Sequence, residues 1–439
     1  MTTFNVTNNS QFQSALNSAK GGDTIVLAAG NYGKSWIANR DYSSTVTIKS
    51  ATLHKAHFDY LQINSSSNLR FEGLDVGHKL SATEGQDTHY ARVSSSDNIK
   101  MIGMAFHGSL DNNPANDGIG LNVTGTTNFQ LMGSSFRDLY RGAYFQQDSD
   151  LTVASNNFQM IRTDGLNFGA VNGAVIDKNS FTNFHPSKGD HADAIQFWLV
   201  NQPYGSSNIS VTNNVIMQGT GAGLQGIFMS DPMSYGYKNV LIQNNLVYGN
   251  DQYHGIYLNG VHGAQVIGNT LLSKSTDSKL MWIQLYNGSN FTVKDNLADN
   301  IIVKSGATGV TMSHNANLIH DSWMRSLIPD LNSPSTAKDL IIADYGYHLP
   351  GTVGTGIAPV STALGQSIGD TLDTTDTATS AQVSHVAVAE TPAPTALPTA
   401  EQVFSATPHY EVSTSGSQMH LVFSEPLYQP HINHFVAMA

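Results

Sequence analysis

The sequence repeats one short motif, in which apolar residues flank a group of three mostly polar residues. Representative copies read "LTVASNNF", "ISVTNNVI", "VLIQNNLV" and "FTVKDNLA". The copies recur every 19 to 35 residues, too irregularly for rigid helical repeats but naturally for a coil of short strands with variable loops. We therefore interpret each copy as one turn of a coil. The central positions of the copies are Leu74, Met104, Ser134, Asn156, Asn179, Asn214, Asn245, Asn269, Asn296 and Asn315.

Asparagine dominates these central positions. Its side chain tolerates left-handed backbone and bonds to neighbouring groups, which suits a tight bend between strands. Amide side chains that stack on successive turns can also bond to one another. The pattern therefore predicts that the asparagines from Asn156 to Asn296 line one bend of the coil.

A second repeat, of the form x-G-I-x-F-x, follows most copies of the first. It begins at Asp117, Arg141, Asp164, Asp193, Gln225, His254 and Met281. Alternation along a strand sends its third and fifth side chains into the core and its fourth outward. The predicted core stack is Ile119, Leu166, Ile195, Ile227 and Ile256. The predicted outward row is Gly120, Tyr144, Asn167, Gln196, Phe228, Tyr257 and Gln284. Rows spaced roughly 4.8 Å apart would form a long, flat floor on which a polymer can lie.

The opening "SQFQSALNSAKGGDTIVLAAGNYG", followed by asparagine-bearing turns, resembles right-handed parallel β-helix proteins of the pectate-lyase-like superfamily. This resemblance covers roughly the first 320 residues, and it implies an all-β, single-stranded right-handed parallel β-helix. The superfamily includes lyases, uronate epimerases, glycoside hydrolases and phage tailspikes, so the fold alone does not select a function.

Two segments carry a closer resemblance. The segment "NNLVYGNDQYHGIYLN" resembles a turn of the bacterial mannuronan epimerases, which are often secreted and calcium-dependent. The segment "GDHADAIQFW" resembles β-helix modules of large secreted calcium-repeat proteins. The Tyr-Gly-Phe-Asp-Pro-His motif of those epimerases is missing, and its acidic and histidine positions would fall on Gln196 and Trp198.

Four parts follow one another along the chain. Residues 1–22 are expected to cap the coil with a helix over residues 10–20, because Phe12 and Leu16 have helical spacing. Residues 23–317 form the β-helix, residues 318–358 a C-terminal cap with helical character, and residues 359–439 a disordered low-complexity tail. The final "HINHFVAMA" resembles C-terminal signals of one-step bacterial export, which predicts a secreted, extracellular protein; the alternative is a plain disordered tail.

Composition limits the partners. Only 12% of residues are charged, about half the usual share, and the net charge is -12. No basic stripe is available to neutralise phosphates, so nucleic acid is excluded, and no apolar run reaches the roughly 18 residues of a membrane span. The absence of cysteine excludes disulfides and thiolate metal sites. We expect an acidic polysaccharide as the partner, docked through local cations or metal ions.

The longest interval between asparagine turns contains "FHPSKGDHADAIQFW", with five ionisable residues within nine positions. They are His185, Lys188, Asp190, His191 and Asp193. Ionisable groups gathered on a loop of a rigid scaffold are typical of a catalytic site. The alternative is a solvated loop in which the two aspartates only close turns.

Neighbouring turns supply partners for this loop. Asp164 and Asp193 are expected about 5 Å apart on consecutive turns, where two carboxylates raise one pKa or recruit a cation. Asp164, Asp190 and Asp193 are therefore candidate ligands for Ca²⁺. Arg162 and Arg141 form a cationic spot beside them, or simply pair with these aspartates.

The outward row supplies the substrate contacts. His254 and Tyr257 are predicted roughly 10 Å beyond Asp193, exposed on the groove floor, where they would donate or accept protons. Aromatic rings stack well on sugar faces. The predicted substrate-binding residues are Tyr144, Asn167, Gln196, Trp198, Phe228, Gln284 and Tyr286.

Three functions fit these residues. In a polysaccharide lyase, Lys188 or His191 would remove the C5 proton of a uronate, Arg162 or Ca²⁺ would neutralise its carboxylate, and Tyr257 or His254 would protonate the leaving oxygen. Epimerisation at C5 is a close variant.

The second function is glycoside hydrolysis, because "TDGLNF", "HADAIQF" and "YHGIYL" resemble a reduced polygalacturonase series, with Asp164, Asp190 and Asp193 as acid and base. The third is a non-catalytic, polysaccharide-binding β-helix.

Overall fold

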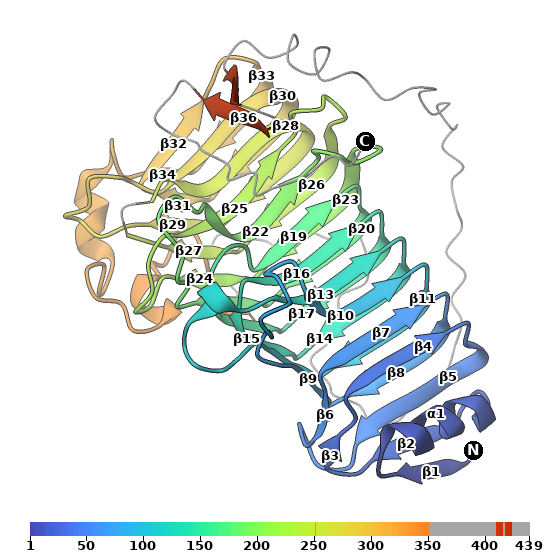
Figure 1. The fold of residues 1–439 in the computed structure, drawn as a ribbon. Helices are drawn as coiled ribbons and strands as arrows, with labels where there is room; N and C mark the ends of the chain where they lie inside the picture. Colours follow the sequence, from blue (N-terminus) through green and yellow to red (C-terminus); the bar gives the residue numbers. More distant parts are fainter. Residues whose placement is uncertain (251, 351–409, 416–417, 424–439) are drawn as a thin grey trace. The chain divides into compact units, whose positions relative to one another are not determined.

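The computed structural model describes residues 1–250, 252–350, 410–415 and 418–423, and the chain divides into two units. The first unit contains the coil (Figure 1). In the second unit, β35 (Tyr410–Ser415) and β36 (Gln418–Phe423) form an antiparallel pair. A wholly disordered tail was therefore a wrong prediction for this pair, whose two runs of strand-forming residues flank a Ser-Gly-Ser sequence. The "HINHFVAMA" terminus lies outside the described residues, so the export signal stays a prediction.

The coil consists of three rows of parallel strands, which confirms the predicted parallel β-helix (Figure 1). The first row contains β4 (Lys34–Ala38), β7 (Tyr60–Asn64), β10 (His89–Ser94), β13 (Ile119–Thr124), β16 (Arg141–Gln146), β19 (Leu166–Gly169), β22 (Ala192–Trp198), β25 (Leu224–Ser230), the first halves of β28 (His254–Ile267) and β30 (Trp282–Lys294), and β32 (Asn300–Val303).

The second row contains β1 (Thr3–Val6), β2 (Thr24–Leu27), β5 (Asp41–Ser50), β8 (Ser67–Glu72), β11 (Asp97–Ile102), β14 (Thr127–Met132), β17 (Ser149–Ala154), β20 (Asn172–Asp177), β23 (Ser206–Thr212), β26 (Tyr237–Gln243), the second halves of β28 and β30, and β33 (Ala307–Ser313).

The third row contains β3 (Gly30–Asn31), β6 (Ala56–Phe58), β9 (Asp75–Gly77), β12 (Ala105–His107), β15 (Ser135–Leu139), β18 (Asn157–Ile161), β21 (Ser180–Thr182), β24 (Val215–Met217), β27 (Leu246–Tyr248), β29 (Thr270–Leu272), β31 (Leu297–Ala298) and β34 (Ala316–Asn317).

Apolar side chains stack from turn to turn inside the coil. Phenylalanine rings of the third row stack at centroid distances of 4.6 to 4.9 Å along the series Phe106, Phe136, Phe158 and Phe181. In the first row the aligned series is Leu121, Ala143, Leu166, Ile195, Ile227, Ile256 and Ile283. The prediction placed Ile119 and Gly120 in these rows, which is wrong by two residues. Leu121 and Asn122 take those places, because a slip of two residues keeps every side chain on the same face and alternation alone cannot detect it.

The asparagine ladder forms as predicted. At each step the backbone N–H and the side-chain amide of one asparagine both donate to Oδ1 of the next asparagine. For Asn179 these bonds to Asn214 measure 2.9 and 3.0 Å. The series is Asn156, Asn179, Asn214, Asn245, Asn269, Asn296 and Asn315. Positive φ angles occur at the preceding residues, such as Lys178 and Asn213, so the ladder asparagines serve as hydrogen-bonding groups rather than as left-handed residues.

Replacement of Asn214 by leucine should destabilise the protein by at least about 2 kcal/mol. The change leaves the backbone N–H of Asn179 and one hydrogen of its amide without an acceptor in a buried site, at about 1–3 kcal/mol each, and removes one donor from the carbonyl of Ile176. Chemical denaturation followed by circular dichroism measures the loss. Asn5→Ala, at an exposed strand position, is the control and should be nearly neutral. Equal stability of the two variants would contradict the ladder.

A helix lies at the N-terminal end of the coil, as predicted. The helix α1 (Asn9–Ser18) begins after Asn8, whose side chain accepts the backbone N–H of Gln11 at 3.0 Å. Phe12 is buried, with its ring 6.4 Å from that of Tyr32 and 5.8 Å from that of Phe58. Figure 1 shows α1 beside β1 and β2. Among the described residues, no helix is long and apolar enough to cross a membrane.

Over residues 318–350, which the structure describes, the regular elements are the short 3₁₀ helices η2 (Ser322–Leu327) and η3 (Ala337–Leu340); another 3₁₀ helix, η1 (Pro114–Asn116), lies before β13. The segment packs along the side of the coil, against the third row as far as Ala316 of β34, and leaves β33 of the last turn largely exposed. Leu246, Leu272 and Leu297 on the third row supply the apolar surface that it covers. The predicted C-terminal cap is therefore a lateral brace.

Asp148 is a buried acid at a bend between the first and second rows. Its Oδ1 accepts the backbone N–H of Thr126 at 2.7 Å, its Oδ2 has no partner among the described residues, and burial raises its pKa to about 7. An acid with a raised folded pKa binds its proton more tightly when folded. Its contribution to stability is therefore present at low pH and is lost as the pH rises through the folded pKa.

Asp148→Asn should therefore raise the melting temperature at about pH 8, because the amide oxygen can still accept the Thr126 N–H without a buried charge. The gain should shrink as the pH is lowered toward about 4. The control is Asp150→Asn at an exposed position two residues later, which should not change the pH dependence. A gain that is independent of pH would contradict the raised pKa.

Candidate functional site

The outward side chains of the first row form one continuous line. Strand register places them in the order Trp36, Gln62, Arg92, Asn122, Tyr144, Asn167, Gln196, Phe228, Tyr257, Gln284 and Ile302. The first three were missed, because their strands lack the x-G-I-x-F-x form, although they alternate in the same way. Trp36 is 55% exposed, and its Nε1 donates to Oε1 of Gln62 at 3.1 Å.

Asp190 anchors the loop of residues 185–193, which carries the predicted ionisable groups. Its carboxylate accepts Nε of Arg162 at 2.7 Å and the backbone N–H of Ser187 at 2.9 Å. Arg162 also donates to Oε1 of Gln86 at 3.2 Å. Arg162 thus pairs with an aspartate, as the simpler alternative predicted, and its guanidinium holds the loop against an earlier turn.

The second arginine pairs with the second aspartate. Nε of Arg141 donates to Oδ2 of Asp164 at 3.1 Å, and its Nη1 bonds to the hydroxyl of Tyr144. Asn167 donates to Oε1 of Gln196 at 2.7 Å. Burial, opposed by Arg141 and reinforced by the carboxylate of Asp193, raises the pKa of Asp164. The expected proximity of the two aspartates is also found, since the backbone N–H of Asp193 donates to Oδ1 of Asp164 at 3.3 Å.

The central feature of the site is a chain of hydrogen bonds from a carboxylate through two imidazoles. Oδ2 of Asp193 lies 2.9 Å from Nδ1 of His191, and Nε2 of His191 lies 3.2 Å from Nδ1 of His254. Burial lowers the pKa of His191 but the adjacent carboxylate raises it, with a net upward shift. Burial and the neighbouring His191 lower the pKa of His254. All three residues were predicted as site residues, but their contact was not. Asp193 and His254 were expected roughly 10 Å apart, and His191 on the loop lies between them.

Aromatic rings surround the far end of this chain. The Phe228 ring stacks on that of Tyr257 at 4.9 Å, and His254 lies 5.1 Å from Tyr257 and 5.8 Å from Trp282. Phe228 and His254 were predicted to be exposed, but they are only 1% and 4% exposed because these rings pack around them.

The other predicted contacts differ in burial. Asn167 and Gln284 are also buried, whereas Tyr144, Gln196, Trp198 and Tyr286 are half-buried. Three polar atoms near the chain of hydrogen bonds are buried and have no hydrogen-bond partner among the described residues: Oδ1 of Asp193, Nε1 of Trp282 and Oε1 of Gln284.

Lys188 takes no part in this network. Its side chain is exposed and forms no hydrogen bond or ion pair within the described part of the chain. The structure therefore brings together His191, Asp193, His254 and Tyr257, and leaves Lys188 outside.

The three candidate calcium ligands do not converge. Asp164 is neutralised by Arg141, Asp190 by Arg162, and Asp193 accepts bonds from His191 and Gln196. The three carboxylates do not form a group of adjoining ligand atoms within the described residues. This arrangement does not fit a calcium site, since Ca²⁺ takes 6–8 oxygen ligands.

Comparison with known proteins supports the fold. No protein-family model and no curated protein matches the sequence. The Dettilon tailspike protein is similar in structure, with a TM-score of 0.51 and 15% identity over 70% of this chain and 63% of the tailspike. The chain has the parallel β-helix fold. The match spans less than two thirds of the tailspike's length, and an identity this low is informative only about the fold.

Two enzymes also align, with lower scores. An alginate lyase from Paenibacillus aligns over 72% of this chain and 99% of its own, at 17% identity and a TM-score of 0.41. An exopolygalacturonase from Yersinia enterocolitica aligns over 72% and 78%, at 14% identity and a TM-score of 0.44.

Asp193→Asn should lower the pKa of His191. The substitution removes the carboxylate that raises this pKa and leaves the burial that lowers it. Nuclear magnetic resonance titration of the imidazole signals, assigned by comparison with His191→Ala, measures the shift. Asp190→Asn is the matched control on the same loop, because Asp190 bonds to Arg162 and Ser187. A similar shift in both variants would contradict the assigned contact.

Proposed function

We propose that this protein is a polysaccharide lyase that cleaves a uronate-containing polymer by β-elimination, with C5 epimerisation as a close variant. One observation carries the proposal: the chain of hydrogen bonds from Asp193 through His191 to His254 on the outward face of the first row. Such a chain can take up or release a proton at one end while a carboxylate stabilises the charge at the other.

The chain has two states that differ by one proton. In the first state His191 is doubly protonated and donates to Asp193 and to Nδ1 of His254. His254 is neutral and carries its proton on Nε2. This state agrees with the raised pKa of His191 and the lowered pKa of His254. After loss of one proton, Nδ1 of His254 donates to His191 and Nε2 presents a lone pair. His254 then acts as the base, and the charge that it gains passes to the His191–Asp193 pair.

The elimination requires three groups. The base takes the C5 proton, the C5–H electrons form the C4=C5 double bond, and the C4–O bond breaks with a proton delivered to the leaving oxygen. We assign proton uptake to His254 with His191, and proton delivery to Tyr257, whose ring lies 5.1 Å from that of His254. Both arginines are paired with an aspartate, Arg141 with Asp164 and Arg162 with Asp190; we assign Arg141 to the uronate carboxylate, because it lies on the first row and also bonds to the outward Tyr144.

The outward row would hold the polymer on either side of this centre. Trp36 and Tyr144 offer rings for sugar faces, while Gln196, Trp198 and Tyr286 line the floor nearer the centre. A polymeric substrate of this kind agrees with secretion to the cell exterior, which we propose together with the activity.

Glycoside hydrolysis is the second candidate, and one observation favours it. Burial raises the pKa of Asp164, as expected of a general acid, and Oδ1 of Asp193 is a buried acceptor without a partner among the described residues. The lyase remains preferred, because Asp164 is paired with Arg141 and Asp193 is hydrogen-bonded to His191.

The deciding experiment incubates the full chain with a panel of acidic polysaccharides, with and without a chelator. A lyase produces the ultraviolet absorbance of an unsaturated uronate. His191→Ala and His254→Ala should each reduce turnover by roughly a hundredfold, the usual scale for a lost acid or base. Lys188→Ala should change turnover little.

His262→Ala is the control for the histidine variants, because His262 is exposed on the second half of β28. Reducing ends without ultraviolet absorbance would identify a hydrolase, and an altered polymer with neither signal would identify an epimerase. Binding without any change in the polymer would leave the third function, a non-catalytic binder. Full activity of both histidine variants would place the catalytic centre elsewhere.

A further inference from the structure

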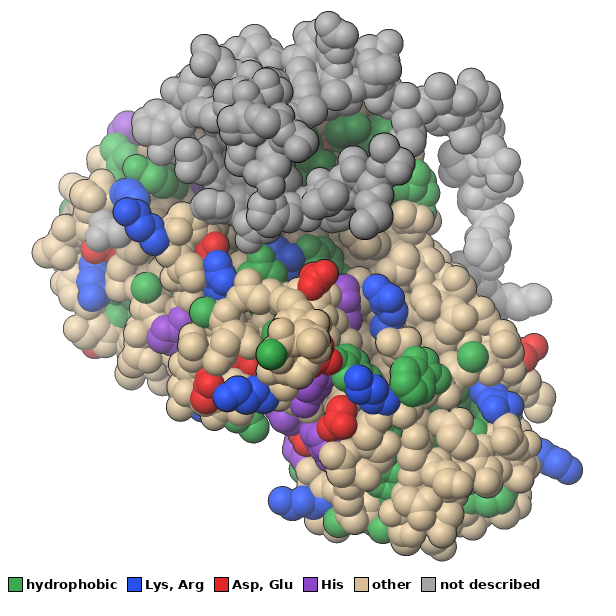
Figure 2. Space-filling model, in the orientation of Figure 1, with side chains coloured by type: hydrophobic (Ala, Val, Ile, Leu, Met, Phe, Trp, Pro, Cys, Tyr) green, Lys and Arg blue, Asp and Glu red, His purple; other side chains and the backbone are tan. Residues whose placement is uncertain are grey.

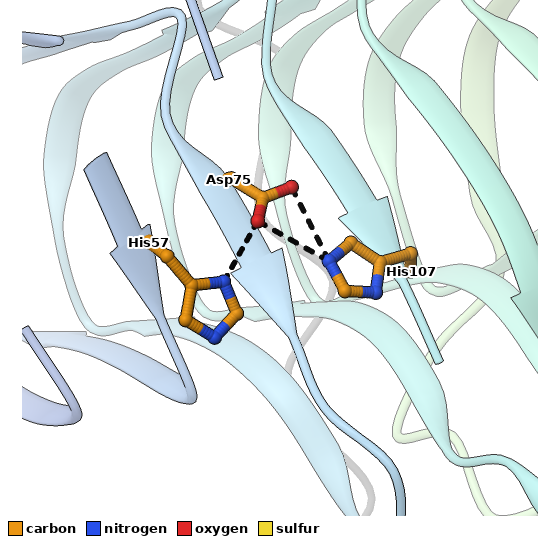
Figure 3. Close-up of side chains that lie close together, drawn as sticks. All are labelled: His57, Asp75 and His107. Atoms are coloured by element: carbon orange, nitrogen blue, oxygen red, sulfur yellow. Dashed lines mark hydrogen bonds and ion pairs between the residues drawn. The ribbon is translucent and has the colours of Figure 1, made fainter. Parts of the chain in front are cut away.

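Two histidines and an aspartate converge on the third row, on three consecutive turns near the N-terminal end of the coil (Figure 3). They are His57 on β6, Asp75 on β9 and His107 on β12. Each offers one ligand atom, and these atoms all lie within 4.8 Å of one another. The three side chains are 25%, 20% and 16% exposed. Histidine and acidic side chains gather at the surface in the region of β6 and β9 (Figure 2).

Each imidazole has a second partner on its other nitrogen. Nε2 of His57 lies 3.1 Å from Oδ1 of Asp59, and Nδ1 of His107 lies 2.7 Å from the carbonyl oxygen of Gly108. A carbonyl and a carboxylate only accept, so these two nitrogens carry the ring protons. The remaining nitrogens, Nδ1 of His57 and Nε2 of His107, face Asp75 at 2.7 and 3.2 Å.

Either ring protons or a metal ion must therefore lie between the two inward nitrogens and Asp75. In neutral imidazoles, the inward nitrogens would direct lone pairs at a carboxylate, which is repulsive. Either both rings carry a second proton, which gathers two cations around one carboxylate, or a metal cation sits between the three groups. Metal-bound histidines almost always donate their other N–H to a carboxylate or a backbone carbonyl, as His57 and His107 do.

We propose that His57, Asp75 and His107 bind a divalent transition-metal ion, of which zinc is the representative. Nδ1 of His57, a carboxylate oxygen of Asp75 and Nε2 of His107 are the ligands, and Asp59 and Gly108 orient the two rings. Two imidazoles with one carboxylate suit zinc, nickel or copper better than calcium, which prefers oxygen ligands alone. Three protein ligands leave one tetrahedral position for water.

The backbone holds the three ligands in place. His57 and Asp75 are paired directly between β6 and β9, and His107 is paired with Gly77. Gly77 has a φ of +142°, and a Cβ there would lie 1.7 Å from the carbonyl oxygen of His107. Only glycine allows β9 and β12 to approach in this way, so the ligand spacing is built into the strands.

Titration of the metal-free full chain with Zn²⁺ by calorimetry, and with Co²⁺ by visible absorption, tests the proposal. We expect one ion per chain and a Co²⁺ spectrum typical of nitrogen and oxygen ligands. His57→Ala, Asp75→Asn and His107→Ala should each weaken binding by at least tenfold, whereas His320→Ala, at an exposed position on the lateral brace, should not. Zn²⁺ should also raise the melting temperature of the wild type and of His320→Ala.

Asp59→Asn keeps all three ligands and removes only a partner of His57. It should weaken binding by roughly tenfold to a hundredfold and provides a test if a ligand variant fails to fold. Absence of stoichiometric binding by the wild type would overturn the proposal. The alternative would then hold, in which both histidines are doubly protonated and donate to Asp75. Equal loss of affinity in His320→Ala and His107→Ala would also overturn it, because binding would then be non-specific.

Discussion

The fold depends on one repeated hydrogen bond, the paired donation from each ladder asparagine to Oδ1 of the next. Six such steps join Asn156 to Asn315, every one within the coil wall. The amide satisfies a backbone N–H that a tight bend would otherwise bury without a partner. Turns fixed in this way stay in register, and the outward residues of the first row from Tyr144 to Ile302 therefore fall into one line. The distances between the site residues are a consequence of that register.

Much of the coil could be predicted from the sequence, because each of the two repeats is a short run of neighbouring residues. Alternation identified the faces of the strands, and the recurrent asparagines identified the bend. What alternation cannot fix is a slip of two residues, and this ambiguity misplaced Ile119 and Gly120. Trp36 and Arg92 were missed because their strands lack the Gly-Ile signature that marks later turns.

The site was predicted in its residues but not in its contacts. Loop conformations depend on partners that are distant in sequence, such as Arg162 and Asp190, or Arg162 and Gln86. The contact between His191 and His254 likewise depends on how the loop folds back over β25, which no local pattern encodes. Burial of His254 follows from the packing of rings on three different turns.

The asparagine ladder does not extend through the whole coil. At the turns of β9 and β12 the equivalent residues are Leu74 and Met104, whose apolar side chains cannot form the hydrogen bonds that link the asparagines. These are also the turns that carry Asp75 and His107, joined to His57 one turn earlier. In the N-terminal turns, the cluster of ionisable side chains at the surface, His57, Asp75 and His107, thus takes the place of the neutral ladder inside the coil. Cohesion there would respond to the acidity and the dissolved cations of the solution, whereas the neutral asparagine ladder of the later turns responds to neither.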